Sequence, residues 1–234
     1  MGNLWIEETL RQVRTDSTLL AIKLPLRETL YTYGVTHNPF EGAVIDLETD
    51  EQNFLDDQCG AARYRNHTAV CCSILDKDEV QIIARTRSAP AELFSQSVDE
   101  RLKKVSRPYY AFNAGCDMAL LSSLLSRDIP FDRELQQCEY QNKGRLRREF
   151  GIPDFSDPFT DNGLLAAREW TNHCDTGNVE CVKRIIAHNL ACVLKEYCIL
   201  MRSGYREIAP SSHKKFLEGK GELVFGIFQN SLKS

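Results

Sequence analysis

The chain has 234 residues, of which 42% are hydrophobic and 26% charged, a composition that excludes wholesale disorder and supplies enough apolar material for a sizeable core. Its 29 basic and 33 acidic residues give a formal net charge of −4, which argues against binding nucleic acid through bulk positive charge. The sequence has no uncharged apolar run of about 18 residues, and acidic residues stand where a secretion signal would be apolar, so we expect a soluble, unsecreted protein.

The nine cysteines are an odd number and contain no C-x-x-C pair, which argues against a secreted disulfide framework and against a zinc ribbon. We expect free thiols in a reducing cytoplasm. Two basic clusters, at 101–107 and 143–148, are candidates for meeting an anionic ligand, although charged clusters of this kind are also typical of solvated faces.

The first 41 residues are interpreted as an N-terminal extension, with a short amphipathic helix from Leu4 to Val13 and an apolar stretch that Pro25 interrupts. From Gly42 the pattern changes to AVIDLETD, a buried strand that runs into an acidic loop over 50–66. The segments TAVCCSIL and EVQIIART, separated by a turn at 76–78, predict an antiparallel hairpin. Three consecutive antiparallel strands are therefore expected.

A helix is predicted over 97–105, then the strand PYYAF, a turn at 113–115 and the helix CDMALLSSLLS. A helical stretch over 132–149, broken at Gly144, precedes the loop GIPDFSDPFTDNG and two more helices over 164–173 and 179–201. The apolar burst LVFGIF predicts an added strand in a C-terminal extension, 202–234. This order favours a mixed α/β sheet with helices on both faces, in a domain covering 42–201.

Asp46 and Glu48 stand two apart at the end of the AVIDLETD strand, so their side chains project from one face and can together hold a hard divalent cation. The same D-x-E spacing recurs at Asp132 and Glu134 within the predicted helix, so spacing alone is not diagnostic. Charges that directly follow a buried strand are costly unless metal or hydrogen bonds compensate them. Asp117, at the start of a predicted helix, is equally typical of a helix cap.

VIDLET, followed about 65 residues later by YAFNAGCD, resembles the first two motifs of the DEDD-type 3′ to 5′ exonucleases, the proofreading-exonuclease branch of the ribonuclease H-like superfold. In that family an apolar strand ends in D-x-E, and N-x-x-[FY]-D precedes a helix. The residues of this chain that match are Asp46, Glu48, Asn113 and Asp117, whereas Cys116 stands where an aromatic residue is usual.

The third motif of that family is similar to IIAHNLACV in the last long predicted helix. His188, Asn189 and Val193 match it, while Cys192 stands where the family has its final aspartate. A thiol is a poor ligand for magnesium or manganese. A replacement carboxylate is conceivable from Glu196, one helical turn further on, or from Asp175 in the preceding loop.

The resemblance implies a ribonuclease H-like mixed sheet whose first three strands are antiparallel, with helices on both faces. It also implies hydrolysis of phosphodiester bonds in DNA or RNA, assisted by two Mg²⁺ or Mn²⁺ ions about 4 Å apart. Because Cys192 replaces an acid, the second ion lacks one expected ligand. The implied partner is nucleic acid, as a single strand or a 3′ end, and no membrane is implied.

The same resemblance implies a role for each matched residue. Asp46, Glu48 and Asp117 are expected to bind metal and act in catalysis, with His188 as the base that takes a proton from water. The residues expected to contact substrate are Asn113, Phe112 and Asn189, with Tyr110 a second candidate for base stacking.

Two other functions remain open at the level of sequence. The chain is either such a nuclease, of reduced activity, or a catalytically impaired ribonuclease H-like protein that binds nucleic acid or acts as a scaffold. A cysteine-dependent enzyme using Cys192 and His188 is the third hypothesis, although nucleophile and base usually meet across different elements.

Overall fold

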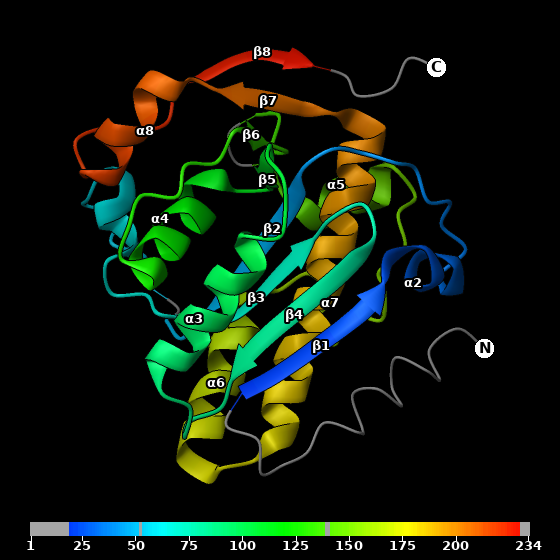
Figure 1. Ribbon diagram of the computed structural model, residues 1–234, viewed down its shortest axis with the longest axis vertical. Coiled ribbons are helices and arrows are strands. Elements are labelled where there is room, and N and C mark those ends of the chain that lie inside the picture. The colour runs from blue at the N-terminus through cyan, green and yellow to red at the C-terminus, as the bar shows by residue number, and fades with distance from the viewer. Residues whose placement is uncertain (1–18, 52, 139–140, 230–234) are drawn as a thin grey trace.

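The computed structural model describes residues 19–51, 53–138 and 141–229, and in this part of the chain eight strands form one mixed sheet (Figure 1). The strand order across the sheet is β1-β4-β3-β2-β5-β6-β7-β8. The strands are β1 (Leu19–Pro25), β2 (Ala43–Thr49), β3 (Ala69–Leu75), β4 (Glu79–Arg85), β5 (Tyr109–Ala111), β6 (Arg133–Glu134), β7 (Tyr205–Ile208) and β8 (Phe225–Gln229).

The sheet is mixed, with parallel pairs only between β2, β5 and β6. β2, β3 and β4 pair antiparallel, as the sequence predicts, and β1 adds antiparallel to β4. β5 pairs parallel to β2, and β6 parallel to β5, before β7 and β8 complete the sheet antiparallel. The carboxyl end of β2 and the carboxyl end of β5 therefore meet at one edge, where chemistry-bearing side chains are commonly placed in open α/β sheets.

Helices cover both faces of the sheet. The helices are α2 (Leu26–Thr32), α3 (Ala91–Leu102), α4 (Ala114–Leu125), α5 (Lys143–Glu149), α6 (Leu164–Thr176), α7 (Val179–Ser203) and α8 (Pro210–Leu217), with a 3₁₀ turn η1 (Gly60–Tyr64). α7 packs on β2, β3 and β4 from one side, while α3 and α4 contact the sheet from the other (Figure 1). Among the described helices, the apolar stretches are too short or too rich in charge for a bilayer crossing.

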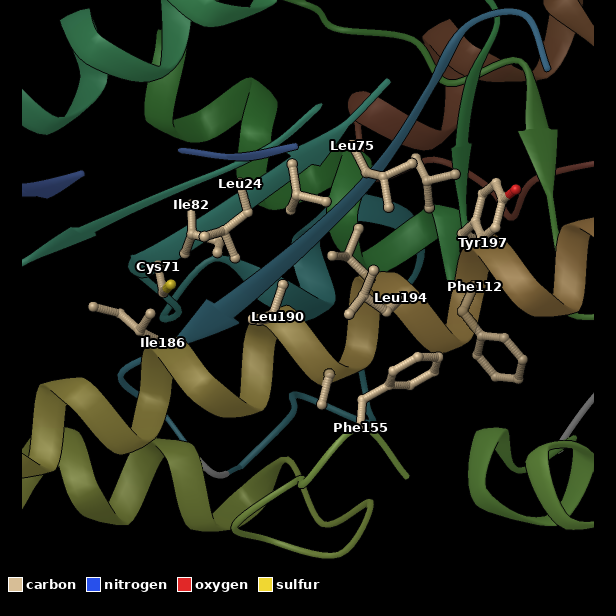
Figure 2. Packing of buried hydrophobic residues seen from close by; sticks show 14 of the residues in the cluster. Leu24, Cys71, Leu75, Ile82, Phe112, Phe155, Ile186, Leu190, Leu194 and Tyr197 are labelled. Atoms are coloured by element: carbon tan, nitrogen blue, oxygen red, sulfur yellow. The ribbon is translucent and has the colours of Figure 1, made fainter. Parts of the chain in front are cut away.

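The long helix α7 fits the sheet because its apolar residues recur every three or four positions. Ile186, Leu190 and Leu194 are at most 3% exposed and face strand residues that include Cys71 and Leu75 (Figure 2). This spacing places them on one helical face, and the two-residue period of the strands supplies the opposing surface. The core under α7 fixes the position of the polar residues on the same helix.

The predicted α/β architecture with helices on both faces is confirmed, with four local differences. α3 begins at Ala91, six residues before the predicted start, and η1 lies inside the predicted acidic loop. Residues 132–138 are not helical, because Arg133–Glu134 form β6 between β5 and β7. Gly144 lies inside α5 rather than at a break. Pairing in the sheet here overrides local helical propensity.

Both predicted extensions contribute to the sheet. The predicted helix Leu4–Val13 lies outside the described residues, but β1 follows it and pairs with β4. In β1, buried Leu20, Ile22 and Leu24 alternate with exposed residues, which is the pattern of a strand. Pro25 is the last residue of this strand and does not interrupt it. β8 agrees with the strand predicted from LVFGIF. The boundary at residues 42 and 201 remains a prediction.

Candidate metal and catalytic site

The acidic pair of β2 lies on the face that α7 covers. Val44 belongs to the core under α7, whereas Ile45 and Leu47 belong to the core under α3 and α4. Asp46 and Glu48 share the parity of Val44, and each is less than a tenth exposed. The two-residue period thus places both carboxylates on one face, as predicted.

Asp117 reaches the same place from α4. β5 leads directly into this helix, whose N-cap Asn113 accepts a hydrogen bond from the Cys116 amide at 3.4 Å. Because β5 is parallel to β2, the first turn of α4 lies at the carboxyl end of β2, and the Leu47 amide donates to Asp117 Oδ1 at 3.0 Å. Asp46, Glu48 and Asp117 line one pocket of about 270 Å³.

Successive turns of α7 complete the wall of this pocket with His188, Cys192 and Glu196. His188 Nε2 lies 3.5 Å from Glu48 Oε1, and Cys192 Sγ lies 3.6 Å from His188 Nε2. Of the two possible replacement carboxylates, Glu196 is the one that lines the pocket, where it is fully buried. Asp175 is exposed near the end of α6 and does not line it.

A lysine already holds positive charge at this site. Lys143, the first residue of α5, places Nζ 3.0 Å from Asp46 Oδ1 and 2.5 Å from Glu196 Oε1. Among the described residues, Glu196 Oε2 is buried without a hydrogen-bond partner. In the sequence Lys143 stands out only as part of the basic cluster 143–148, because nothing local indicates that α5 places it beside the carboxylates.

The loop 151–163 supplies a second set of charges that holds His188 in place. Asp157 Oδ1 lies 2.6 Å from His188 Nδ1, and Lys195 Nζ lies 2.5 Å from both Asp157 Oδ2 and Asp161 Oδ1. Burial opposes ionisation of Asp157, but the hydrogen bonds and charges of His188 and Lys195 hold its pKa well below the usual range. Asp157 is absent from the predicted site residues, although the repeated acids of the Pro-containing loop before the motif helix indicate that this loop could carry a functional carboxylate.

The three residues predicted to contact substrate lie in different settings. Asn113 is exposed at the pocket, and Phe112 lines it with its ring centroid 5.6 Å from Lys143 Nζ. Asn189 is fully buried: its amide donates to Asp46 Oδ2 at 2.5 Å, and its carbonyl oxygen accepts from Ser73. Asn189 therefore orients Asp46, and its own side chain is not accessible to a substrate. Tyr110 packs in the core under α7.

Burial dominates the electrostatics of the pocket. It raises the pKa of Glu48 and of Asp117 well above the usual range, and neighbouring Asp46 adds to the rise in both. Burial also raises the pKa of Glu196, although Lys143 opposes the rise. Carboxyl groups held this way bind either protons or a cation. For His188, burial alone would lower the pKa, but Glu48 and Asp157 raise it overall.

Cys192 differs from the acids around it. Burial raises the pKa of its thiol to about 12, and only 5% of the residue is exposed. A buried thiol that stays protonated is a poor nucleophile, which argues against cysteine-dependent catalysis through Cys192 and His188.

Comparison with protein-family models, with curated proteins and with solved structures finds no match to this chain.

Proposed function

We propose that this chain is a metal-dependent 3′ to 5′ exonuclease-like nuclease of the ribonuclease H-like fold, acting on DNA or RNA. The observation that carries the proposal is the convergence of Asp46 and Glu48 from β2 with Asp117 from α4 in one pocket. The order β4-β3-β2-β5-β6, antiparallel on one side of β2 and parallel on the other, agrees with the fold that the sequence resemblance implies.

The carboxylates fit a hard divalent cation. Asp46, Glu48 and Asp117 would hold Mg²⁺ or Mn²⁺, with the unpartnered Glu196 Oε2 as a further oxygen ligand. Such a cation supplies charge that activates water and stabilises the leaving oxygen. Cys192 does not fit a second hard ion, because a thiol is a soft ligand.

The side chains around the cation site perform the proton transfer. His188 Nε2 points toward Glu48 and takes a proton from the attacking water, while Asp157 on Nδ1 fixes the ring and stabilises the imidazolium. The water oxygen forms a bond to phosphorus as the bond from phosphorus to the 3′ oxygen breaks. The 3′ oxygen then takes up a proton from solvent.

The pocket also has groups suited to a nucleic-acid end. Asn113 is exposed at the pocket, where its amide suits a sugar or phosphate oxygen, whereas the Phe112 ring borders the pocket but is only 7% exposed. The partner is thus a single strand or a 3′ end. All nine cysteines lie in the described residues and are free thiols, which supports a cytoplasmic setting.

One observation favours the second candidate, a catalytically impaired ribonuclease H-like protein that binds nucleic acid or acts as a scaffold. The Lys143 ammonium neutralises Asp46 and Glu196 without any metal, and Cys192 is not an acid. A pocket stabilised internally in this way retains its shape without supporting hydrolysis.

The test is digestion of single-stranded DNA and RNA oligonucleotides labelled at the 5′ end, with Mg²⁺ or Mn²⁺. We expect slow Mn²⁺-dependent shortening from the 3′ end. Cys192→Asp should raise the rate at least about tenfold by restoring an oxygen ligand, and Asp117→Asn should abolish it. Asp128→Asn, which changes an exposed acid near the end of α4, is the matched control and should leave the rate unchanged.

Failure of both the wild type and Cys192→Asp to digest any strand, with binding of single strands retained, would establish the impaired binding protein instead. Loss of both digestion and binding would remove nucleic acid as the partner altogether.

A further inference from the structure

One corner of the pocket has a ligand set unlike the carboxylates. Glu48, His188 and Cys192 each direct one donor atom into it, and these atoms all lie within 4.8 Å of one another. All three residues are buried. An oxygen, a nitrogen and a sulfur donor are typical of zinc sites, whereas sites for magnesium use oxygen alone.

The two separations that involve His188 Nε2 agree with ligands around a tetrahedral ion, and Glu48 and Cys192 lie within 4.8 Å of each other. Zinc bond lengths of about 2.0–2.1 Å to nitrogen, 2.0–2.2 Å to oxygen and 2.3 Å to sulfur place N and O about 3.4 Å apart, and N and S about 3.6 Å apart. The observed separations are 3.5 Å from His188 Nε2 to Glu48 Oε1 and 3.6 Å from His188 Nε2 to Cys192 Sγ. A direct charge-assisted bond between His188 and Glu48 would be nearer 2.8 Å.

The ring of His188 is oriented by a carboxylate on its second nitrogen, as is usual for histidines that bind a metal. Its Nδ1 lies 2.6 Å from Asp157 Oδ1, so Nδ1 carries the proton and leaves the Nε2 lone pair facing the corner. Lys195 in turn fixes Asp157 at 2.5 Å. This carboxylate–histidine arrangement orients the ring and increases the basicity of Nε2 toward an ion.

Ligand charge favours an ion in this corner. The Lys143 ammonium forms ion pairs with Asp46 and Glu196, and its positive charge also acts on Glu48 and Cys192. Two anionic ligands, the Glu48 carboxylate and a Cys192 thiolate, match the charge of one dication. A Cβ at Gly163 would lie 3.9 Å from both Glu48 Oε2 and His188 Nε2, so the start of α6 borders this corner.

We propose that Glu48, His188 and Cys192 bind one zinc ion in a site with an open fourth position. Cys192, which stands in place of the expected aspartate, would then make the site select zinc instead of abolishing metal binding. This proposal concerns the pocket of the proposed function, but zinc binding stands independently of phosphodiester hydrolysis. With zinc bound, His188 holds the ion and is not available to take a proton.

The test is metal binding by the full chain after chelator treatment and reloading. We expect one Zn²⁺ per chain, retained in a large excess of Mg²⁺. Co²⁺ in its place should give the near-ultraviolet thiolate charge-transfer band that a cysteine ligand produces. Cys192→Ser should remove that band, whereas Cys198→Ser, a buried cysteine of α7 outside the pocket, should keep it. Asp157→Asn should weaken zinc binding about 10- to 100-fold.

Absence of stoichiometric zinc in the folded wild type would overturn the proposal. So would a cobalt band that survives Cys192→Ser, or one that both serine variants lose equally. Zinc binding without any oligonucleotide digestion overturns only the nuclease function, and Mg²⁺-dependent digestion by a chain that binds no zinc overturns only the zinc site.

Discussion

Lys143 sets the charge balance of the pocket at the scale of single residues. Its ammonium contacts Asp46 and Glu196, whose side chains are 9% and 0% exposed. Burial alone would lower the pKa of Lys143, but Asp46 and Glu196 raise it well above its usual value, so the charge persists. A divalent cation at Asp46 therefore competes with this lysine.

Replacing Lys143 with methionine should separate these effects. Lys143→Met leaves two buried carboxylates without their counter-charge and should lower the free energy of unfolding by about 3–5 kcal/mol. Mn²⁺ should restore stability far more in the variant than in the wild type, because the cation takes the place of the ammonium. Thermal unfolding with and without Mn²⁺ measures this.

Lys103→Met is the control, because Lys103 is 67% exposed and its pair with Asp99 is a surface ion pair worth less than about 1 kcal/mol. An equal Mn²⁺ effect on Lys143→Met and on the wild type would show that no cation binds beside Asp46.

The residues of the site divide according to whether local sequence determines their position. Asp46 and Glu48 could be predicted to share a face because strand geometry fixes it, and Asp117 because a strand and helix deliver it to the same edge. Lys143 and Asp157 could not, because they come from α5 and from a loop that reach the pocket only through tertiary packing.

At the scale of elements, β6 shows how tertiary pairing decides structure. Its two residues were predicted to be helical, yet Glu134 lies 3% exposed between β5 and β7 and accepts a hydrogen bond from Arg206 at 3.1 Å. Long patterns such as those of α7 and the β3–β4 hairpin are predictable because many residues share one period. A two-residue strand has no period to detect.

Glu134 gives a pH dependence whose sign follows from its burial. Burial raises the pKa of Glu134 to about 7, against the opposing charge of Arg206. The folded state therefore holds a proton that the unfolded chain releases near pH 4.5, so this group reduces stability as pH rises from about 4.5 to 7. Denaturant unfolding should show that the wild type loses stability between pH 5 and pH 8. The loss in Glu134→Gln over the same range should be smaller, by of order 2 kcal/mol, because glutamine does not ionise.

The same titration on Arg145→Gln, which removes an exposed charge from α5, should follow the wild type. A stability difference between wild type and Glu134→Gln that is constant across this range would refute the assignment.

At the scale of the whole molecule, the C-terminal segment supports the site. α8 packs on η1, and Phe216 of α8 is 2% exposed. A Cβ at Gly115, in the first turn of α4, would lie 3.3 Å from Phe216 Cζ. The turn that carries Asp117 thus rests on residues nearly a hundred positions later, which sequence periodicity does not reveal.

Phe216→Ala should therefore affect both stability and the site. Truncating this buried ring should lower the free energy of unfolding by about 3–5 kcal/mol. It should also weaken Mn²⁺ binding in the fraction that remains folded, because the first turn of α4 loses its support. Denaturant unfolding and Mn²⁺ titration check the two effects.

Ile227→Ala, at an 83% exposed position of β8, is the control and should change stability by less than about 0.5 kcal/mol. Normal Mn²⁺ binding by folded Phe216→Ala would show that α8 does not support the site.

The most direct measurement is a crystal structure after soaking in Mn²⁺, with an anomalous difference map to locate the ion. The proposed function predicts a peak within about 2.0–2.6 Å of carboxylate oxygens from Asp46, Glu48 and Asp117, with the Lys143 ammonium moved away from Asp46. A map without a peak among these three side chains, with Lys143 still between Asp46 and Glu196, would contradict it.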